Sequence, residues 1–186
     1  MPILLYPDPH LRYECHLMNR FDRWLAGVCD AMFREMGNSK GIGLAAPQVG
    51  LPFSLFVMKI PEPQVYINPT VQYYGTTTTE NEACLSIPGL IAPVARFNKI
   101  RISASDQQGI PFQKLLSGLA ARCAQHEYDH LQGVLFTDRC QKGLEQAEFL
   151  AQLAEKQAVQ GDRVVLSEKD TERLNDLRRQ YCYGDA

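Results

Sequence analysis

Apolar and polar positions along the chain predict four helices. Apolar residues recur every three to four positions in Asp22–Met36 and again in Leu144–Gln160, so each stretch should form an amphipathic helix. Ser117–Leu131 contains no proline and is followed by Gly133, which can end a helix; it is the predicted central helix. After Ser167 the chain is mostly polar with a weak apolar side, so we expect a peripheral helix or tail there.

Short apolar or alternating runs predict the strands. The expected strands are Phe53–Ile60, Gln64–Ile67, Val71–Tyr74, Lys99–Asp106 and Phe112–Leu115. Asn81–Pro93 contains a Pro-Gly pair and is predicted to be irregular. Strand blocks that alternate with one buried helix favour an α+β fold, with small antiparallel or mixed sheets packed around the central helix and one or more helices at the C-terminus.

Length and composition are those of one globular domain. The chain has 186 residues, 45% of them hydrophobic, which suffices for one sizeable core. A net charge of −2 gives no signature of nucleic-acid binding, although a transient ribosome contact through a local patch is compatible with it. No apolar stretch reaches the length of a transmembrane helix, so no membrane partner is expected.

The cysteines and the first residues bear on location. The six cysteines form no CxxC pair and no regular spacing, which is typical of reduced thiols in a cytosolic protein. The opening MPILLYP has no basic region and carries prolines, so we expect no secretory signal. The predicted location is therefore cytoplasmic, and an organellar form processed from a longer precursor would show the same features.

The strongest chemical signal is the segment His126–His130 (HEYDH). Residues four apart share one face of a helix, so the two imidazoles of His126 and His130 can bind one divalent metal ion. The carboxylate of Glu127 lies beside the first of them and can reach a water molecule on that metal.

A catalytic metal site usually has three protein ligands, and the residues alone leave the third open. Phe136 stands where a metzincin would have its last histidine. Glu145 or Glu148 would serve as the third ligand of a thermolysin-type zinc endopeptidase. Cys84 lies upstream, in the segment predicted to be irregular, and loops often carry functional groups.

A glycine-rich segment, Gly41–Gln48 (GIGLAAPQ), has two features that suit a substrate site. Its small residues would let a substrate backbone approach closely, and the Gln48 amide could stabilise an oxyanion. The segment lacks the Lys-Ser/Thr of a P-loop, which argues against a phosphate site.

Taken together, Gly41–Gln48, Glu82–Ser86 (EACLS) and His126–His130 resemble the motifs of the peptide deformylase family. The resemblance implies hydrolytic removal of the formyl group from the N-terminal formyl-methionine of nascent polypeptides. It covers roughly residues 3–140, so we expect a catalytic domain of residues 1–140. Residues 141–186 match no motif of the family, and their apolar pattern predicts a helical extension packed on the same domain. The alternatives are an HExxH zinc endopeptidase and an inactive deformylase-like protein that binds N-terminal peptides.

The resemblance assigns the metal and the acid–base residue. Cys84, His126 and His130 would hold the metal, natively Fe(II), with zinc, nickel or cobalt as substitutes. Glu127 would take a proton from the attacking water and later deliver it to the leaving amine.

The same resemblance assigns the groups that meet the substrate. Gln48 and the backbone N–H of Leu85 would stabilise the oxyanion, and Gly43 would lie beside the bound peptide. Three residues match the lining of the methionine pocket: Ile42, Leu119 and Cys123.

A few further positions should support the site. Glu82 and Arg96 match positions at which the family has residues that brace the site. Asp129 should either orient a metal ligand or hold the helix in place. Arg122 is expected to point outward or to pair with an acid. Ala83 stands where the family has glycine, and its methyl group would disturb Cys84 if the position required a positive φ.

Overall fold

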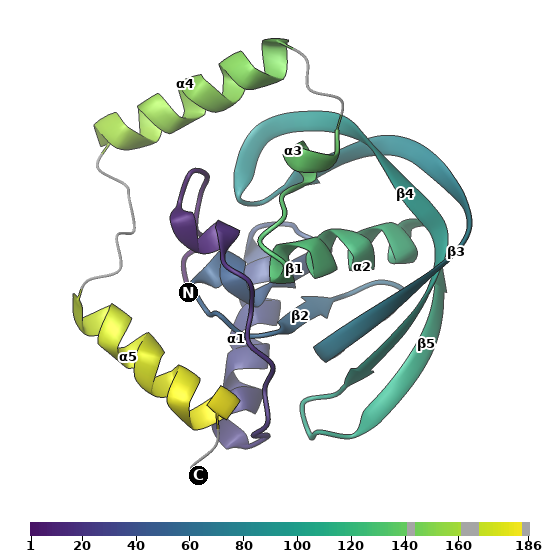
Figure 1. Cartoon of the computed structure of the whole chain (residues 1–186), viewed down its shortest axis with the longest axis vertical. Coiled ribbons are helices and arrows are strands. Elements are labelled where there is room, and N and C mark those ends of the chain that lie inside the picture. Colours follow the sequence, from purple (N-terminus) through teal and green to yellow (C-terminus); the bar gives the residue numbers. More distant parts are fainter. Residues whose placement is uncertain (141–143, 161–167, 184–186) are drawn as a thin grey trace.

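The computed structural model describes residues 1–140, 144–160 and 168–183 of the chain. A single antiparallel sheet carries five strands in sequence order. The strands are β1 (Gly43–Ala45), β2 (Leu55–Met58), β3 (Gln64–Cys84), β4 (Ile87–Ser105) and β5 (Pro111–Ser117). Figure 1 shows that β3 and β4 form a long curved hairpin.

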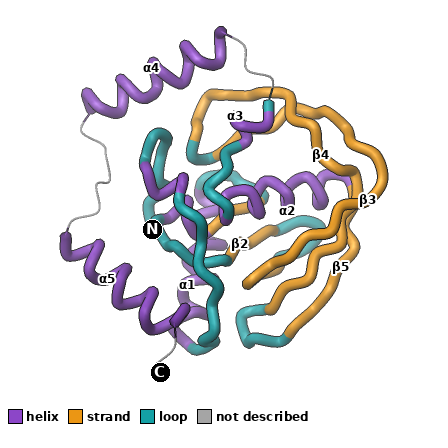
Figure 2. Tube along the Cα trace, viewed as in Figure 1, coloured by secondary structure: helices purple, strands orange, loops and turns teal. Residues whose placement is uncertain are grey.

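Figure 2 shows helices inside the curve of this sheet and others to one side of it. The α-helices are α1 (Arg23–Asn38), α2 (Gly118–Leu131), the short α3 (Phe136–Arg139), α4 (Leu144–Gln160) and α5 (Glu168–Arg178). Three shorter turns of helix complete the set: η1 (Pro9–Arg12), η2 (Ala46–Val49) and η3 (Arg179–Tyr183). The α+β prediction is therefore confirmed.

The central helix α2 lies inside the curve of the β3–β4 hairpin (Figure 1). Its small residues Ala121 and Ala124 are fully buried against Phe56, Tyr66 and neighbouring strand residues. Small side chains allow the helix to approach the sheet closely. The sheet therefore fixes the position of α2, and one face of this helix lies toward the turn between β3 and β4.

The structure corrects the prediction for Asn81–Pro93. This segment is regular: β3 runs on to Cys84, a two-residue turn follows, and β4 begins at Ile87. Its prolines fit because this half of β4 pairs only with β3, whereas β5 pairs from Lys99 onward, and proline is tolerated on a strand with one free edge. Likewise Gly75, with φ of +74°, bends β3 at a register shift instead of ending it.

The C-terminal segment is less peripheral than its polar composition suggests. Tyr181 is only 2% exposed and packs in the same core as α1, with its ring centroid 4.3 Å from that of Trp24. Its hydroxyl donates to the carboxylate of Asp22, which caps the start of α1. The prediction of a peripheral tail is thus wrong for this residue.

Helix α4 also contacts the β3–β4 hairpin. Phe149, Leu150 and Leu153 pack against the apolar cluster under the hairpin turn, which includes Cys84 and Leu90. The division of the chain at residue 140 stays a prediction.

Among the described residues, no helix combines the length and the apolar character needed to cross a bilayer.

Tyr181 should contribute measurably to stability. We expect Tyr181→Ala to lower the free energy of unfolding by about 3–5 kcal/mol, because it empties a large buried site. Tyr181→Phe should cost about 1–2 kcal/mol, the contribution of a hydrogen bond to a carboxylate. Gln180→Ala, at an exposed neighbour, is the matched control. Urea denaturation measures all three, and equal stabilities for Tyr181→Ala and Gln180→Ala would contradict the packing.

Candidate metal centre

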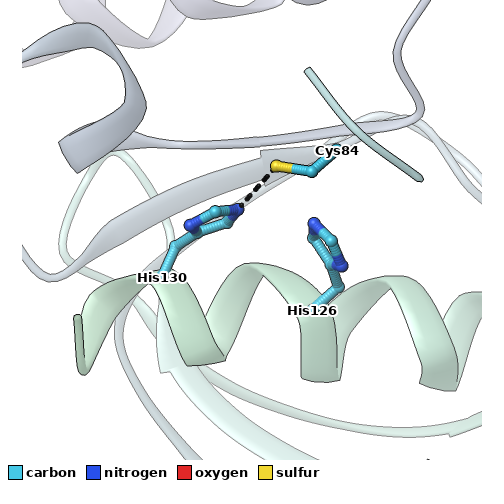
Figure 3. A group of neighbouring side chains, drawn as sticks. All are labelled: Cys84, His126 and His130. Atoms are coloured by element: carbon cyan, nitrogen blue, oxygen red, sulfur yellow. Dashed lines mark hydrogen bonds between the residues drawn. The ribbon is translucent and has the colours of Figure 1, made fainter. Parts of the chain in front are cut away.

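Three potential metal ligands converge between α2 and the end of β3 (Figure 3). His126 and His130 project from one face of α2, and Cys84 is the last residue of β3. Their ligand atoms all lie within 4.8 Å of one another, and Cys84 Sγ is 3.3 Å from His130 Nε2. Ligands on one tetrahedral ion stand about 3.5 Å apart, given bonds of 2.0–2.3 Å. The donor set therefore fits a single divalent metal ion.

Contacts around the hairpin turn hold Cys84 in this position. Gln48 lies in η2, where its Oε1 accepts the N–H of Ala45 at 2.9 Å. Its Nε2 is thereby turned to the site, 3.2 Å from Ser86 Oγ and 3.5 Å from Cys84 Sγ. The N-terminal segment fixes both backbones, since Leu4 N–H donates to Gln48 O and Tyr6 N–H donates to Ser86 O.

A buried carboxylate, Glu82, orients the first histidine. Its Oε2 lies 2.9 Å from His126 Nδ1. A carboxylate only accepts hydrogen bonds, so Nδ1 carries the hydrogen and the Nε2 lone pair is left for a metal. Arg96 binds both Glu82 oxygens at 2.9 Å, and Arg122 donates to Oε1 at 2.8 Å. Although burial raises it, the hydrogen bonds from His126 and Arg96 lower the pKa of Glu82 to about 2.

Asp129 pins the helix and does not contact a ligand. Its carboxylate accepts from Arg96 on β4 and from Arg139 on α3. Arg96 thus bridges Glu82 and Asp129, which joins the hairpin to α2. Of the two roles predicted for Asp129, the geometry supports the second.

Glu127 faces the floor of the site beside Gly43. A Cβ atom at Gly43 would stand only 2.4 Å from Glu127 Oε1 and 2.7 Å from Cys123 Sγ, so this position has room for hydrogen alone. Glu127 is 4% exposed, and among the described residues its Oε2 has no hydrogen-bond partner. Burial raises the pKa of Glu127 to about 7. A carboxyl group of that kind can both accept and donate a proton near neutral pH.

One cavity of about 350 Å³ opens onto this site. All the residues predicted for catalysis and substrate binding line it: Glu127, Gln48, Leu85, Ile42, Gly43, Leu119 and Cys123. Two of the predicted ligands, Cys84 and His126, line it as well, whereas His130 lies behind them, 1% exposed. The sequence motifs, far apart along the chain, therefore meet in one place.

The surroundings of the remaining candidate residues bear on their predicted roles. Arg122 is buried and pairs with Glu82, as one of the two expectations had it. Ala83 is exposed and does not adopt a positive φ, so its methyl group leaves Cys84 undisturbed. Glu148 is exposed on α4 and belongs to no group of converging ligands among the described residues, and the side chain of Glu145 lies outside them.

The sequence alone indicates no role for Ser86 and Arg139. Ser86 is fully buried and holds the Gln48 amide, and Arg139 pairs with Asp129. Ser86 lies inside the EACLS motif, which could have pointed to it. Nothing in the local sequence points to Arg139, because its role depends on the fold that brings α3 against α2.

Two histidines four apart on a helix, a glutamate beside the first and an open cavity are the arrangement of a metal-dependent hydrolase. The comparisons with known proteins narrow this class. The polypeptide deformylase family matches residues 1–146. The chain belongs to this family, whose members remove the N-terminal formyl group from nascent peptides.

Relatives come from bacteria and from plants. Peptide deformylase 1B, chloroplastic/mitochondrial, of Arabidopsis thaliana is 44% identical over 146 residues, which cover 75% of this chain and 54% of the plant protein. The chain thus spans about half the length of that relative. Peptide deformylase of Chromobacterium violaceum is 42% identical over 141 residues, covering 74% of this chain and 84% of that protein.

Solved structures show the same fold. The crystal structure of a peptide deformylase from Legionella pneumophila superposes with a TM-score of 0.79 at 34% identity, covering 87% of this chain and 98% of the other. The family assignment favours the deformylase prediction over a zinc endopeptidase and over an inactive peptide-binding protein.

The bridge made by Arg96 should be essential to the fold. We expect Arg96→Met to destabilise the chain by about 3–5 kcal/mol, because it leaves two buried carboxylates without a charge partner. Arg101→Met, on the exposed face of the same strand, should cost less than about 1 kcal/mol. Thermal unfolding monitored by circular dichroism compares the two, and similar melting temperatures would refute the bridge.

Proposed function

We propose that this chain hydrolyses the formyl group of N-terminal formyl-methionine in newly made polypeptides and releases formate. The observation that carries the proposal is the convergence of Cys84, His126 and His130 beside Glu127 at the floor of an open cavity. Membership of the family supports the reaction, and the geometry supports the roles of individual residues.

Cys84, His126 and His130 would hold one divalent ion, which we propose is Fe(II). A thiolate and two imidazoles also accept zinc, nickel and cobalt, so the donor set alone does not choose among them. When bound, the ion supplies Lewis acidity that activates water and polarises the formyl group. The free electron pair at His126 Nε2, fixed by Glu82, supports this ligand role.

Glu127 is the proposed acid–base residue. It stands one residue from His126 on the same helix and reaches the cavity floor against Gly43. In the ionised form it would accept a proton from the attacking water. In the protonated form it would deliver that proton to the nitrogen that leaves when the formamide C–N bond breaks.

Gln48 and the backbone N–H of Leu85 are the proposed oxyanion donors. Gln48 Nε2 is held beside Cys84 by the bond from Ala45 N–H to its Oε1, so it needs no reorganisation during the reaction. Leu85 directly follows Cys84 and lines the same cavity. Two fixed donors on one side of the formyl carbon would stabilise the charge that develops on its oxygen.

The methionine side chain would occupy the part of the cavity lined by Ile42, Leu119 and Cys123. Arg122 also lines the cavity, but its guanidinium is directed to Glu82 and to the carbonyl oxygens of neighbouring strands. The slot is therefore mostly apolar, which suits a flexible thioether side chain. Gly43 leaves room beside it for the peptide backbone.

Location and partners remain proposals. The six cysteines form no CxxC pair and no regular spacing, which supports a reducing compartment. We propose the bacterial-type cytoplasm; the matrix of an organelle fits the thiols and the plant relatives equally. Nascent formyl-methionyl peptides are the proposed partners, and a ribosome contact stays a prediction.

Exchange of Glu127 for glutamine should separate catalysis from metal binding. We expect Glu127→Gln to keep its metal and lower kcat for a formyl-Met peptide at least about a hundredfold, because glutamine can neither accept nor deliver the proton. His130→Ala should lose the metal instead, since it removes a ligand. Formate release and metal content are measured for both. Near-normal turnover of Glu127→Gln would contradict the assignment, as would metal loss equal to that of His130→Ala.

The identity of the metal is tested by loading. We expect the iron form, prepared without oxygen, to hydrolyse a formyl-Met peptide faster than the zinc form and to lose activity slowly in air as Fe(II) oxidises. The zinc form serves as the air-stable control, with metal content of each preparation determined by mass spectrometry. A zinc form as active as the iron form would contradict the iron assignment.

A further inference from the structure

We propose that Lys40 makes this chain prefer formyl peptides with an acidic side chain at the third residue. The inference rests on the proposed deformylase function and adds a charge preference to it. Lys40 lies in the turn between α1 and β1 and lines the same cavity as Cys84 and Glu127.

The backbone holds Lys40 firmly at the mouth of the cavity. Its φ is +57°, a left-handed conformation that is uncommon for a residue with a side chain. Two hydrogen bonds fix this turn: Lys40 N–H donates to Gly37 O at 3.1 Å, and Gly41 N–H donates to Met36 O at 2.8 Å. The ammonium group can therefore move on its flexible stem, but its point of attachment is set.

The position of Lys40 along the substrate follows from the edge of the sheet. Strand β1 lies at one end of the strand order and pairs only with β2, so its other edge can face a peptide. Gly43 marks the catalytic end, because it abuts Glu127, and Gly41 lies farther out, beside Leu85. We place the reacting formyl group at Gly43. An extended chain rises about 3.3 Å per residue, so the three positions from Gly43 to Lys40 span at most about 10 Å and match the distance from the formyl group to the third substrate residue. The third substrate residue would therefore lie opposite Lys40.

Lys40 is an uncompensated charge in the cavity wall. Arg122 also lines the cavity, but its charge is occupied by Glu82, Glu80 and two backbone carbonyls. His126 is held by Glu82. Within the part of the chain that the structure describes, no carboxylate lies within ion-pair distance of Lys40. Glu80, which does not line the cavity, pairs with Arg122.

The expected preference is modest and sensitive to salt. Lys40 is exposed, so its attraction for a carboxylate about 4 Å away corresponds to roughly a fivefold gain in affinity in water. The gain should appear in KM and not in kcat, because this contact lies away from the reacting bond. It should shrink at high ionic strength, where the Debye length falls to about 3 Å.

The test compares formyl-Met-Ala-Glu-amide, formyl-Met-Ala-Gln-amide and formyl-Met-Ala-Lys-amide on the metal-loaded full chain. We expect kcat/KM to be about fivefold higher for the glutamate peptide than for the glutamine peptide, with the lysine peptide lower again. In Lys40→Gln the kcat/KM values for the three peptides should converge. In Lys40→Glu the lysine peptide should have the highest kcat/KM and the glutamate peptide the lowest. Lys40→Arg should keep the wild-type order. Lys99→Gln, an exposed lysine on β4 that does not line the cavity, is the matched control and should also keep it.

A second series moves the glutamate to substrate residue two, three or four, and the largest gain should occur at residue three. Equal rates for the three peptides in an active wild-type enzyme would overturn the proposal, as would a preference that survives in Lys40→Gln. A gain that peaks at another position would overturn the placement. Failure of the proposed function gives a different result, because then no peptide would release formate.

Discussion

The structure depends on one buried carboxylate, Glu82. Removing it from water is costly unless its charge is balanced and its oxygens are hydrogen-bonded. Arg96, Arg122 and His126 do both, and they come from β4 and α2 while Glu82 comes from β3. The same contacts that make the carboxylate tolerable in the core therefore fix the helix against the hairpin. The fold and the site therefore depend on the same hydrogen bonds, and a substitution that breaks these bonds affects both.

The carboxylate of Glu82 and the thiol of Cys84 also favour a positive charge at His126. Although burial lowers it, hydrogen bonds to Cys84 and Glu82 raise the pKa of His126 to about 10. A proton at this position is one way to satisfy the surrounding negative groups, and a divalent cation is another. His130, by contrast, has its pKa lowered by burial and by the neighbouring cationic groups His126 and Arg96, so it favours the neutral form that ligates metals.

Local patterns in the sequence predicted local structure well and long-range contacts poorly. Leu144–Gln160 was predicted with the bounds that the structure gives, and the HEYDH segment does place both histidines on one helix face. The hairpin over Asn81–Pro93 was missed, because its prolines are tolerated only through the position of β5 elsewhere in the sheet. The burial of Tyr181 was missed too, since a lone aromatic residue in a polar segment gives no periodic signal.

The spacing of residues within the motifs follows from the two-residue repeat of strand β3 and the three- to four-residue repeat of helix α2. Alternate residues of a strand share a face, so Glu82 and Cys84 both face α2, whereas the Ala83 between them is exposed. Residues three and four apart on a helix share a face, so Arg122, His126 and His130 follow one another along the side of α2 that meets the strand. Glu82 thus meets Arg122 and His126 one turn apart, and Cys84 meets His130. Because Ala83 is exposed and does not adopt a positive φ, its methyl group does not alter this pairing.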